Sequence, residues 1–238
     1  MLLFFIRHGD PIYDPDSLTP LGKRQAEAVS RRLALYGIDR VYASSSTRAI
    51  QTATPTSEVV KKEIQILDWC NESHAWRDLT VKYPDGRMTW CFFDPETRKK
   101  FLSDEIYRLG RRWYDHPDFA GNGFKPGMER ISREADRFLK ELGYVHDPEA
   151  RLYTAAKPNE ERITLFAHQG FGLAFLSHIL DIPYPLFCTR FDLGHSSMTV
   201  IEFTERYGCV VPRVLTQSND SHLYRDGLPT FYQNEIYF

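Results

Sequence analysis

Two short apolar runs, each ending in a histidine, constrain the fold of this chain more than any other feature. The first run covers residues 2–6 and leads into Arg7 and His8. The second covers residues 163–167 and leads into His168. Runs of this length and composition are typical of buried strands, and each is followed by a segment with helical character. Strands that alternate with helices in this way predict an α/β fold.

The other predicted elements alternate in the same way. Thr19 is a suitable N-cap for a helix that has Pro20 at its first position and ends near Gly37. Pro55 predicts a kink or an early end in a second helix over residues 47–59. Further strands are expected at residues 40–43, 64–67, 198–203 and 210–215, and a further helix at residues 171–180. We therefore expect a three-layer sandwich, with a mostly parallel central sheet covered by helices on both faces.

The pattern changes between residues 70 and 149, where there is little strand signal. Helical spacing predicts helices over residues 96–113 and 128–142, and a loop rich in Gly and Pro over residues 115–127. After this region, residues 152–155 and 163–167 are predicted to form a hairpin. The chain of 238 residues is expected to form a single domain, residues 1–238, with a helical cap inserted at residues 70–149.

Arg7 and His8 together suit one class of ligand. A guanidinium group neutralises and orients a phosphate, and a neutral imidazole beside it can attack phosphorus. A second arginine, Arg48, lies in the first turns of the helix that follows the serine-rich residues 44–46, and such a helix start binds anions. Two guanidinium groups also oppose the charged form of His8. These residues predict phosphoryl transfer through a phosphohistidine.

In their order along the chain, these segments resemble the histidine phosphatase superfamily, which includes cofactor-dependent phosphoglycerate mutases and acid phosphatases. Residues 7–9, Arg-His-Gly, are similar to the signature triplet of that family. The other similar segments are residues 18–22 with Gln25 and Ala26, residues 48–53, His168 with Gly170, and residues 219–223.

The resemblance implies a role for each charged residue of the site. His8 is the expected nucleophile, and Arg7, Arg48 and His168 are expected to bind the phosphate, with His168 also taking part in catalysis. Because these donors stabilise the charge on the transferred phosphoryl group, no metal and no other cofactor is expected.

The leaving alkoxide needs a proton, and members of the family place an acidic residue after the third strand. Glu72 is the candidate donor, and Asp68 is the alternative. A solvated loop carboxylate without a catalytic role is the third interpretation. Burial beside Trp69 or Trp76 would raise the pKa of the donor towards a useful range.

Several positions depart from the family pattern. Ser73 follows Glu72 where phosphoglycerate mutases carry an arginine, which disfavours mutase activity on glycerate phosphates. Gln169 separates His168 from the next glycine and indicates a helix start displaced by one residue. A carboxylate at Asp14, where many members have an amide, would repel phosphate. Either Asp14 points away or the loop that contains Asp10 and Asp14 is arranged differently.

The insertion over the active site is rich in aromatic residues. They either form a small core of their own or, in part, line an apolar pocket above the phosphate. Trp76 and His195 are the candidate pocket residues, although His195 is equally interpretable as an exposed loop histidine. His178 is interpreted as a packed helix residue and His222 as a structural one. The aromatic residues concerned are Trp69, Trp76, Trp90, Phe92, Phe93, Trp113, Tyr114 and Phe119.

Composition limits the partners. A net charge of -2 provides no basic surface for nucleic acid, and the five-residue apolar start is too short for a signal peptide or a membrane span. The four cysteines are far apart, show no zinc-binding pair and are expected to be reduced. These features predict a cytoplasmic enzyme that binds no membrane, and the sequence carries no signal of oligomeric state.

The predicted function is a metal-independent phosphomonoesterase that acts on a small phosphorylated metabolite through His8. The alternatives are a phosphomutase and a catalytically weak member of the family that binds a phosphorylated ligand or a partner protein.

Overall fold

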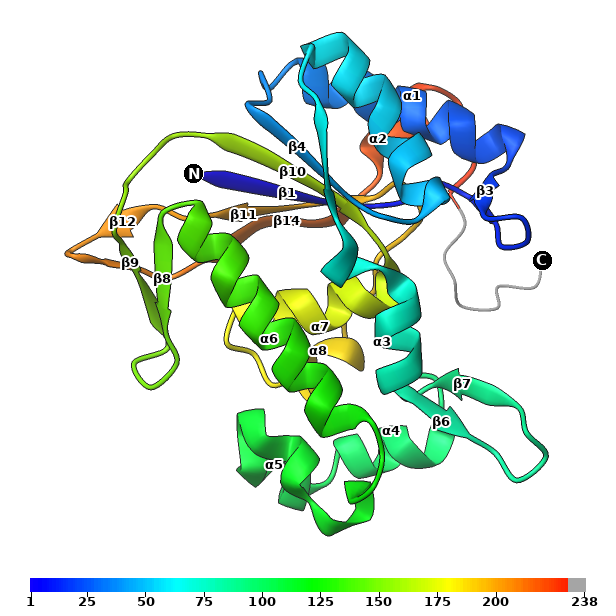
Figure 1. Ribbon diagram of the computed structural model, residues 1–238, viewed down its shortest axis with the longest axis vertical. Helices are drawn as coiled ribbons and strands as arrows, with labels where there is room; N and C mark the ends of the chain where they lie inside the picture. The colour runs from blue at the N-terminus through cyan, green and yellow to red at the C-terminus, as the bar shows by residue number, and fades with distance from the viewer. Residues whose placement is uncertain (231–238) are drawn as a thin grey trace.

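A six-stranded sheet forms the centre of the molecule, which is described as a computed structural model over residues 1–230 (Figure 1). The strand order is β14-β11-β1-β10-β4-β5. β1, β10, β4 and β5 are mutually parallel, whereas β11 runs antiparallel to both of its neighbours, so the expected mostly parallel sheet is confirmed. The strands are β1 (Leu2–Arg7), β4 (Arg40–Ser44), β5 (Ile64–Leu67), β10 (Arg162–Ala167), β11 (Met198–Glu202) and β14 (Arg213–Asn219).

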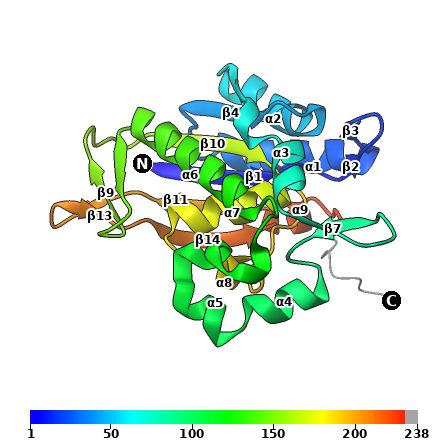
Figure 2. The same cartoon turned by 60° about the horizontal axis from the view of Figure 1, so that its bottom comes forward.

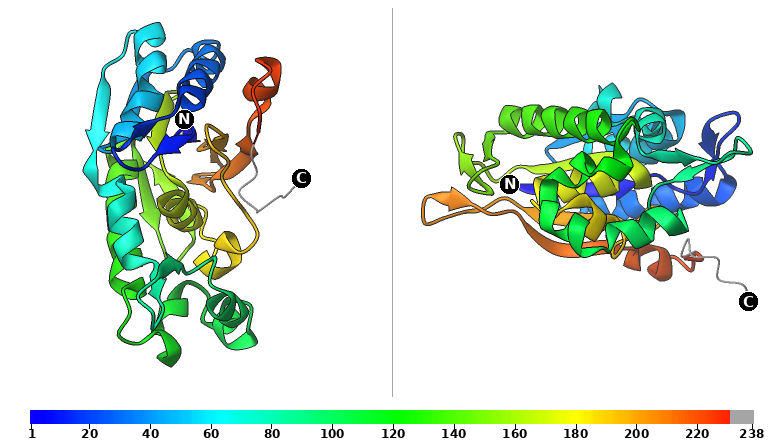
Figure 3. Two further views of the ribbon diagram at one scale, coloured as in Figure 1. Left: turned by 90° about the vertical axis from the view of Figure 1, so that its right-hand side faces the viewer. Right: turned by 90° about the horizontal axis from the view of Figure 1, so that it is seen from below.

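Helices cover both faces of this sheet (Figure 1). α1 (Pro20–Ala34) and α2 (Thr47–Val60) lie on one face, and α6 (Phe124–Glu141) and α7 (Gln169–Ile179) lie on the other. The alternation of side chains along β1 explains both layers: Phe4 packs into the core beneath α1 and α2, and Phe5 packs into the core on the α7 side. α9 (Ser221–Arg225) lies beside α1 (Figure 3).

Local sequence signals explain where the first two helices begin. Thr19 accepts a hydrogen bond from the amide of Gly22, and Ser46 accepts one from the amide of Ala49, as N-caps do. Pro20 occupies the first helical position of α1. The expected early end of α2 does not occur, because the helix continues past Pro55 to Val60.

The predicted helix over residues 96–113 is wrong, because the chain forms two shorter helices there. α4 (Pro95–Phe101) ends before Ser103, which caps α5 (Asp104–Leu109) by accepting a hydrogen bond from the amide of Ile106. Gly110 ends α5 in a left-handed conformation. Short 3-10 turns follow at residues 110–115 and 117–119, and α6 begins four residues earlier than predicted.

The region before α4 also contains elements that the sequence did not reveal. α3 (Glu72–Asp78) precedes a two-stranded hairpin of β6 (Thr80–Lys82) and β7 (Met88–Trp90). α8 (Tyr184–Cys188) follows α7. α4 and α5 lie beyond α8, on the opposite side of the molecule from α1 and α2 (Figure 2).

The predicted hairpin between residues 152–155 and 163–167 is also wrong. β10 is buried on both faces and lies between β1 and β4, whereas β9 is only half buried. β9 joins a second, four-stranded sheet instead. Its strands are β8 (Tyr144–Asp147), β9 (Leu152–Ala155), β12 (Glu205–Arg206) and β13 (Cys209–Val210). The final strand begins after Pro212, which has no N–H for the ladder, so it starts at Arg213 and not at residue 210.

One hydrophobic cluster runs from the sheet into the insertion, so the two parts share a core. It includes Leu3 and Phe5 of β1 together with Phe101, Trp113 and Phe119. The four cysteines are unpaired, and three of them are buried. Within residues 1–230, no helix is long and apolar enough to cross a membrane.

Candidate active site

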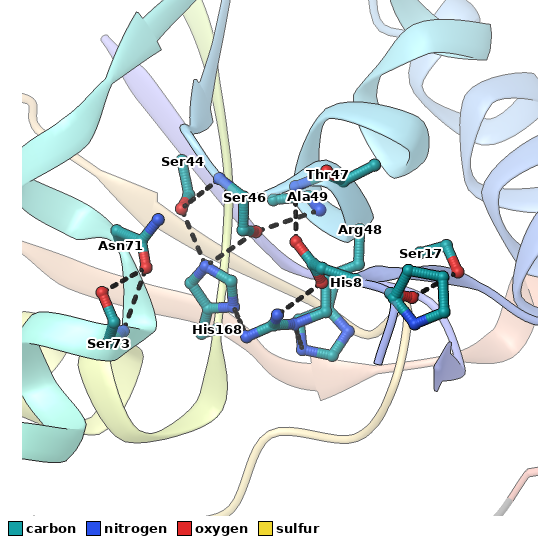
Figure 4. Close-up of polar contacts among 12 residues, drawn as sticks. His8, Ser17, Ser44, Ser46, Thr47, Arg48, Ala49, Asn71, Ser73 and His168 are labelled. Atoms are coloured by element: carbon teal, nitrogen blue, oxygen red, sulfur yellow. Dashed lines mark hydrogen bonds and ion pairs between the residues drawn. The ribbon is translucent and has the colours of Figure 1, made fainter. Parts of the chain in front are cut away.

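The carboxyl ends of the central parallel strands bring the two signature histidines together. β1 ends at Arg7 and β10 at Ala167, and these residues are register partners. His8 and His168 come directly after them, with ring centroids 5.2 Å apart (Figure 4). Ligand sites of open α/β sheets form at this edge, because the loops that leave adjacent strands diverge there.

His8 is buried and held as a neutral imidazole with a defined tautomer. Its Nδ1 lies 2.7 Å from the carbonyl oxygen of Gly9. A carbonyl can only accept, so Nδ1 carries the proton and the lone pair is on Nε2. Burial lowers the pKa of His8 well below its ordinary value, and the nearby His168, Arg7 and Arg48 lower it further. Nε2 is therefore available as a nucleophile.

Arg48 connects the two histidines. Its Nε donates to Nε2 of His8 over 3.2 Å, and its NH2 group donates to Nδ1 of His168 over 3.2 Å. Because Nδ1 of His168 accepts, its Nε2 carries a proton, which it donates to the hydroxyl of Ser44 over 2.8 Å. Burial, followed by the charges of Arg48 and Arg7, lowers the pKa of His168 well below its ordinary value.

Arg7 presents a donor without a partner. One of its terminal nitrogens donates to the carbonyl oxygen of Leu193 over 2.6 Å, and the other donates to Nε2 of His195 over 2.8 Å. Its Nε is buried and has no hydrogen-bond partner within residues 1–230. An unsatisfied buried donor on a cation is costly unless a ligand accepts the bond, so this nitrogen indicates an anionic ligand.

His195 is not an exposed loop residue. Accepting from Arg7 fixes the lone pair of His195 on Nε2, and burial together with the charge of Arg7 lowers its pKa to about 3. It does not line the cavity itself. His195 therefore positions the Arg7 guanidinium.

Asp16 is a residue of the candidate site that the sequence did not reveal. β2 (Pro11–Ile12) and β3 (Ser17–Leu18) form a short hairpin that brings Asp16 to the start of α2. Its carboxylate accepts from Arg48 over 2.6 Å and from the amide of Thr47 over 2.7 Å. The sequence signal that could have indicated Asp16 is the serine-capped helix start after residue 46. Such a helix start attracts a carboxylate as well as a phosphate.

Asp10 and Asp14, the two acidic residues of the loop after β1, do not take part in the candidate phosphate site. Asp14 is exposed and does not line the cavity, so it points away from the phosphate site. Asp10 accepts from the Thr19 hydroxyl over 2.7 Å, and its amide donates to the side chain of Gln25 over 2.8 Å. Asp10 thus ties the loop to the start of α1.

Glu72 and Asp68 differ in surroundings. Glu72 lines the cavity, and its two oxygens accept from the amides of Gly170 and Phe171, each over 2.9 Å. Burial raises the pKa of Glu72, against the effect of these two bonds. Asp68 is exposed and lies outside the cavity lining. Hydrogen bonds from Ser45 and His74 lower its pKa. Of these two carboxyl groups, Glu72 is the one whose pKa is raised and that lines the cavity.

The position of Gln169 corrects one prediction, and that of His222 agrees with another. α7 begins at Gln169 directly after His168, so the helix start is not displaced, and the Gln169 side chain lines the cavity and donates to Asp192. His222 is buried, with Nε2 3.0 Å from the carbonyl oxygen of Ser196, in agreement with a structural role.

A cavity of about 770 Å³ opens above these groups. Its floor contains Arg7, His8, Arg48 and Glu72, whereas one wall is aromatic. The indole rings of Trp76 and Trp90 meet edge to face with centroids 4.9 Å apart. The lining residues of the aromatic wall are Tyr13, Trp76, Trp90 and Phe93. The aromatic residues of the insertion are therefore divided, because Trp113 and Phe119 belong to the core.

Comparison with known proteins agrees with this arrangement. Residues 3–100 match the family model of the histidine phosphatase superfamily, branch 1. No curated protein sequence matches the chain significantly.

Among solved structures, similar folds include a mycobacterial hydrolase at 18% identity, with a TM-score of 0.61 over 92% of this chain and 98% of that one. A phosphoserine phosphatase from Entamoeba histolytica has 20% identity and a TM-score of 0.58 over 93% and 98% of the two chains. A mycobacterial glucosyl-3-phosphoglycerate phosphatase has 18% identity and a TM-score of 0.58 over 90% and 97%. The resemblance inferred from the sequence is thereby confirmed: residues 3–100 carry the signature of the histidine phosphatase superfamily, branch 1, and the chain has the fold of these solved structures.

Proposed function

We propose that this protein is a phosphomonoesterase that needs no metal and acts through a phosphohistidine on His8. The observation that carries the proposal is the neutral, tautomerically fixed His8 imidazole between the guanidinium groups of Arg7 and Arg48. A phosphomonoester carries about 1.5 to 2 negative charges at neutral pH, so it needs cationic neighbours to approach a nucleophile. Both arginines are buried and therefore act on the phosphate with little screening.

The phosphate would accept hydrogen bonds from N–H groups of Arg7 and Arg48. One of these groups has no partner among the described residues, and another can exchange its present partner for the phosphate. Nε of Arg7 has no partner within residues 1–230, and Arg48 can transfer its bond from Asp16 to the ligand. His168 accepts from Arg48 through Nδ1 and so holds the guanidinium group that would bind the phosphate. These groups would stabilise the charge on the equatorial oxygens of the transition state.

In the first step, Nε2 of His8 attacks phosphorus and the bond from phosphorus to the ester oxygen breaks. The leaving alkoxide takes the proton of Glu72. In the second step, the Glu72 carboxylate removes a proton from water while the oxygen of that water attacks phosphorus. The bond between phosphorus and His8 breaks, and inorganic phosphate leaves.

The cavity wall indicates the class of alcohol. The cations among its lining residues are Arg7 and Arg48, and both are committed to the phosphate. Within residues 1–230, the cavity offers a substrate carboxylate no further cation, whereas Trp76, Trp90 and Phe93 offer flat apolar surface. We therefore propose a small organic phosphate whose alcohol is aromatic or apolar, and not a glycerate phosphate.

Two solved structures with this fold are named as phosphatases of phosphoserine and of glucosyl-3-phosphoglycerate, which supports hydrolysis as the reaction class. The substrates in those names belong to those two proteins, and the proposal for this chain includes neither of them.

The proposal is tested with a phosphomonoester that carries radiolabelled phosphate, such as labelled p-nitrophenyl phosphate. We expect label on the protein that survives base and is lost in acid, as phosphohistidine chemistry requires. His8→Ala should abolish both the label and hydrolysis. His116→Ala, a change in the insertion outside the cavity, should leave both unchanged.

The outcomes separate the alternatives. Hydrolysis that persists in His8→Ala would exclude the mechanism. Transfer of the label to an added alcohol in preference to water would indicate a phosphomutase. Binding of inorganic phosphate without turnover of any ester would indicate a catalytically weak binding protein.

A further inference from the structure

Three potential metal ligands lie together outside the proposed active site. Asp136 belongs to α6, His146 to β8, and His178 to the last turn of α7. Their ligand atoms all lie within 4.8 Å of one another. Oδ1 of Asp136 is 2.9 Å from Nδ1 of His146 and 2.8 Å from Nε2 of His178. The proposed phosphatase chemistry uses none of these residues.

The donor set selects a class of ion. Two imidazole nitrogens and one carboxylate oxygen are ligands that zinc and the neighbouring d-block ions prefer, whereas magnesium and calcium prefer oxygen alone. A tetrahedral ion at about 2.0–2.1 Å from each donor would separate the donor atoms by roughly 3.3 Å. The Asp136 carboxylate must therefore move back by about half an ångström, and its partial exposure of 34% leaves room for that movement.

The surroundings hold His146 in the orientation that a metal ligand needs. Its Nε2 lies 3.0 Å from Oδ2 of Asp181, so Nδ1 is the nitrogen that faces Asp136. Asp181 is itself fixed by a bond of 2.9 Å from Arg111. The His146 ring stacks on Tyr153 with centroids 4.4 Å apart and a tilt of 12°. Ligating histidines in metalloproteins commonly donate their second nitrogen to such a carboxylate.

The cluster also has an open side. A cavity of about 660 Å³ is lined by Asp136 and His178 together with Ser132 and Ser177, and residues of the 3-10 turn at 110–115, including Arg111, line it as well. An ion can enter through this cavity, and a water molecule in it can fill the fourth coordination position. Three protein ligands with one open position are a common arrangement for zinc.

We propose that Asp136, His146 and His178 bind a divalent d-block cation of the zinc type, with Asp181 as the carboxylate that orients His146. Such an ion would join α6, β8 and the end of α7, the helix whose first amides bind Glu72. Without the ion, protons on the two histidines bridge to Asp136, as the hydrogen bonds show. The sequence spacing of these ligands fits no short zinc motif, so only the fold reveals the site.

The test uses the full chain after dialysis against a chelator, with Zn²⁺ and Co²⁺ as separate probes. Calorimetry should show one Zn²⁺ per chain, and Co²⁺ should give the intense visible bands of a tetrahedral site. Asp136→Asn and His178→Gln should each weaken binding at least tenfold, and Asp181→Asn should weaken it roughly 10- to 100-fold, as loss of a supporting carboxylate does.

Two controls keep the result specific. His116 lies 3.2 Å from a carboxylate oxygen of Glu105 and close to Asp118, so it is also a histidine beside carboxylates but lies outside the proposed metal site. His116→Gln should therefore bind Zn²⁺ like the wild type. His8→Ala should also retain binding, which separates this site from the phosphatase chemistry.

Two outcomes would overturn the proposal. The first is a wild-type chain that shows neither a bound Zn²⁺ nor a tetrahedral Co²⁺ spectrum, because the cluster then holds protons alone. The second is a bound ion that survives in both Asp136→Asn and His178→Gln, or is lost in His8→Ala, because it then lies elsewhere. Circular dichroism of each variant shows whether a loss of binding reflects unfolding. The wild-type Co²⁺ spectrum tests the site even if a variant does not fold.

Discussion

At the scale of single residues, hydrogen bonds fix the protonation states of the site. The Gly9 carbonyl holds the proton of His8 on Nδ1, and the Arg48 guanidinium donates towards Nε2. Burial, followed by the charges of the neighbouring groups, including Arg48, lowers the pKa of His8 and favours a neutral imidazole, and these effects outweigh the bond to Gly9, which raises the pKa. The proposed nucleophile is therefore neutral before a substrate binds, and the substrate only has to replace Arg48 at Nε2.

The role proposed for Glu72 depends on the leaving group. Glu72→Gln cannot donate a proton, so we expect a loss of about 100-fold or more in kcat with alkyl phosphates. With p-nitrophenyl phosphate, whose leaving group needs no proton, the loss should be much smaller. Steady-state kinetics on both substrates measures the difference.

Glu72 also accepts from two amides at the start of α7, and a purely structural role would have a different signature. Equal losses on the two substrates, accompanied by lower thermal stability, would mean that the residue only anchors the helix.

At the scale of elements, the short β2–β3 hairpin controls the charge at the start of α2. It places the Asp16 carboxylate against Arg48, a proposed phosphate ligand, and against the Thr47 amide. The Asp16 carboxylate thus neutralises Arg48, and we expect it to compete with a bound phosphate. Tyr13 of the same hairpin packs its ring over the Arg48 guanidinium, 5.4 Å from the ring centroid, and keeps it in place.

Asp16→Asn should bind inorganic phosphate more tightly. The amide keeps an acceptor for Thr47 and removes the competing charge, so we expect a decrease in Kd of roughly tenfold, or about 1.4 kcal/mol. Calorimetric titration with phosphate at low ionic strength measures it. Asp14→Asn, a change at an exposed position outside the cavity, should leave Kd unchanged. Weaker phosphate binding in Asp16→Asn would show that the carboxylate positions Arg48 and does not compete.

The approach of α1 to the loop after β1 depends on Gly22. A Cβ at that position would lie 2.2 Å from the carbonyl oxygen of Asp10, and backbone cannot move aside as a side-chain tip can. Gly22→Ala should therefore destabilise the fold by about 2–3 kcal/mol, although alanine favours a helix. Gly194→Ala, whose nearest new contact is 3.7 Å, is the matched control and should cost much less. Urea unfolding compares the two variants, and equal values would contradict the argument.

At the scale of the whole molecule, buried neutral histidines couple stability to pH. Burial lowers the pKa of His8, His168, His195 and His222. The folded state leaves these rings neutral, whereas the unfolded chain protonates them once the pH falls below about 6.5. Acid therefore favours the unfolded state, and stability should fall as the pH falls below that value.

His222 allows a quantitative test, because burial, followed by the charge of Arg32, lowers its pKa to about 4. Its contribution should reduce the free energy of unfolding by about 2–3 kcal/mol between pH 7 and pH 4.5. His222→Gln removes this proton uptake, so its stability should fall less steeply over the same interval. Urea unfolding at several pH values measures the slopes, and equal slopes would show that His222 does not titrate in this way.

Features that depend on neighbours along the chain could be predicted from the sequence. Apolar runs of strand length, the N-caps Thr19 and Ser46 and the order of the segments predicted the layers of the sandwich and the arrangement of Arg7, His8, Arg48 and His168. These predictions succeed because parallel strands bring their carboxyl ends to one edge, whatever connects them.

Features that depend on distant partners became visible only in the folded molecule. The fold placed Asp16 on Arg48, bound Glu72 to the start of α7, and set β10 between β1 and β4 instead of beside β9. It also assembled Asp136, His146 and His178 from three separate elements. Local patterns do not encode such contacts, because the energies of charge pairing, burial and strand pairing depend on which segments packing brings together.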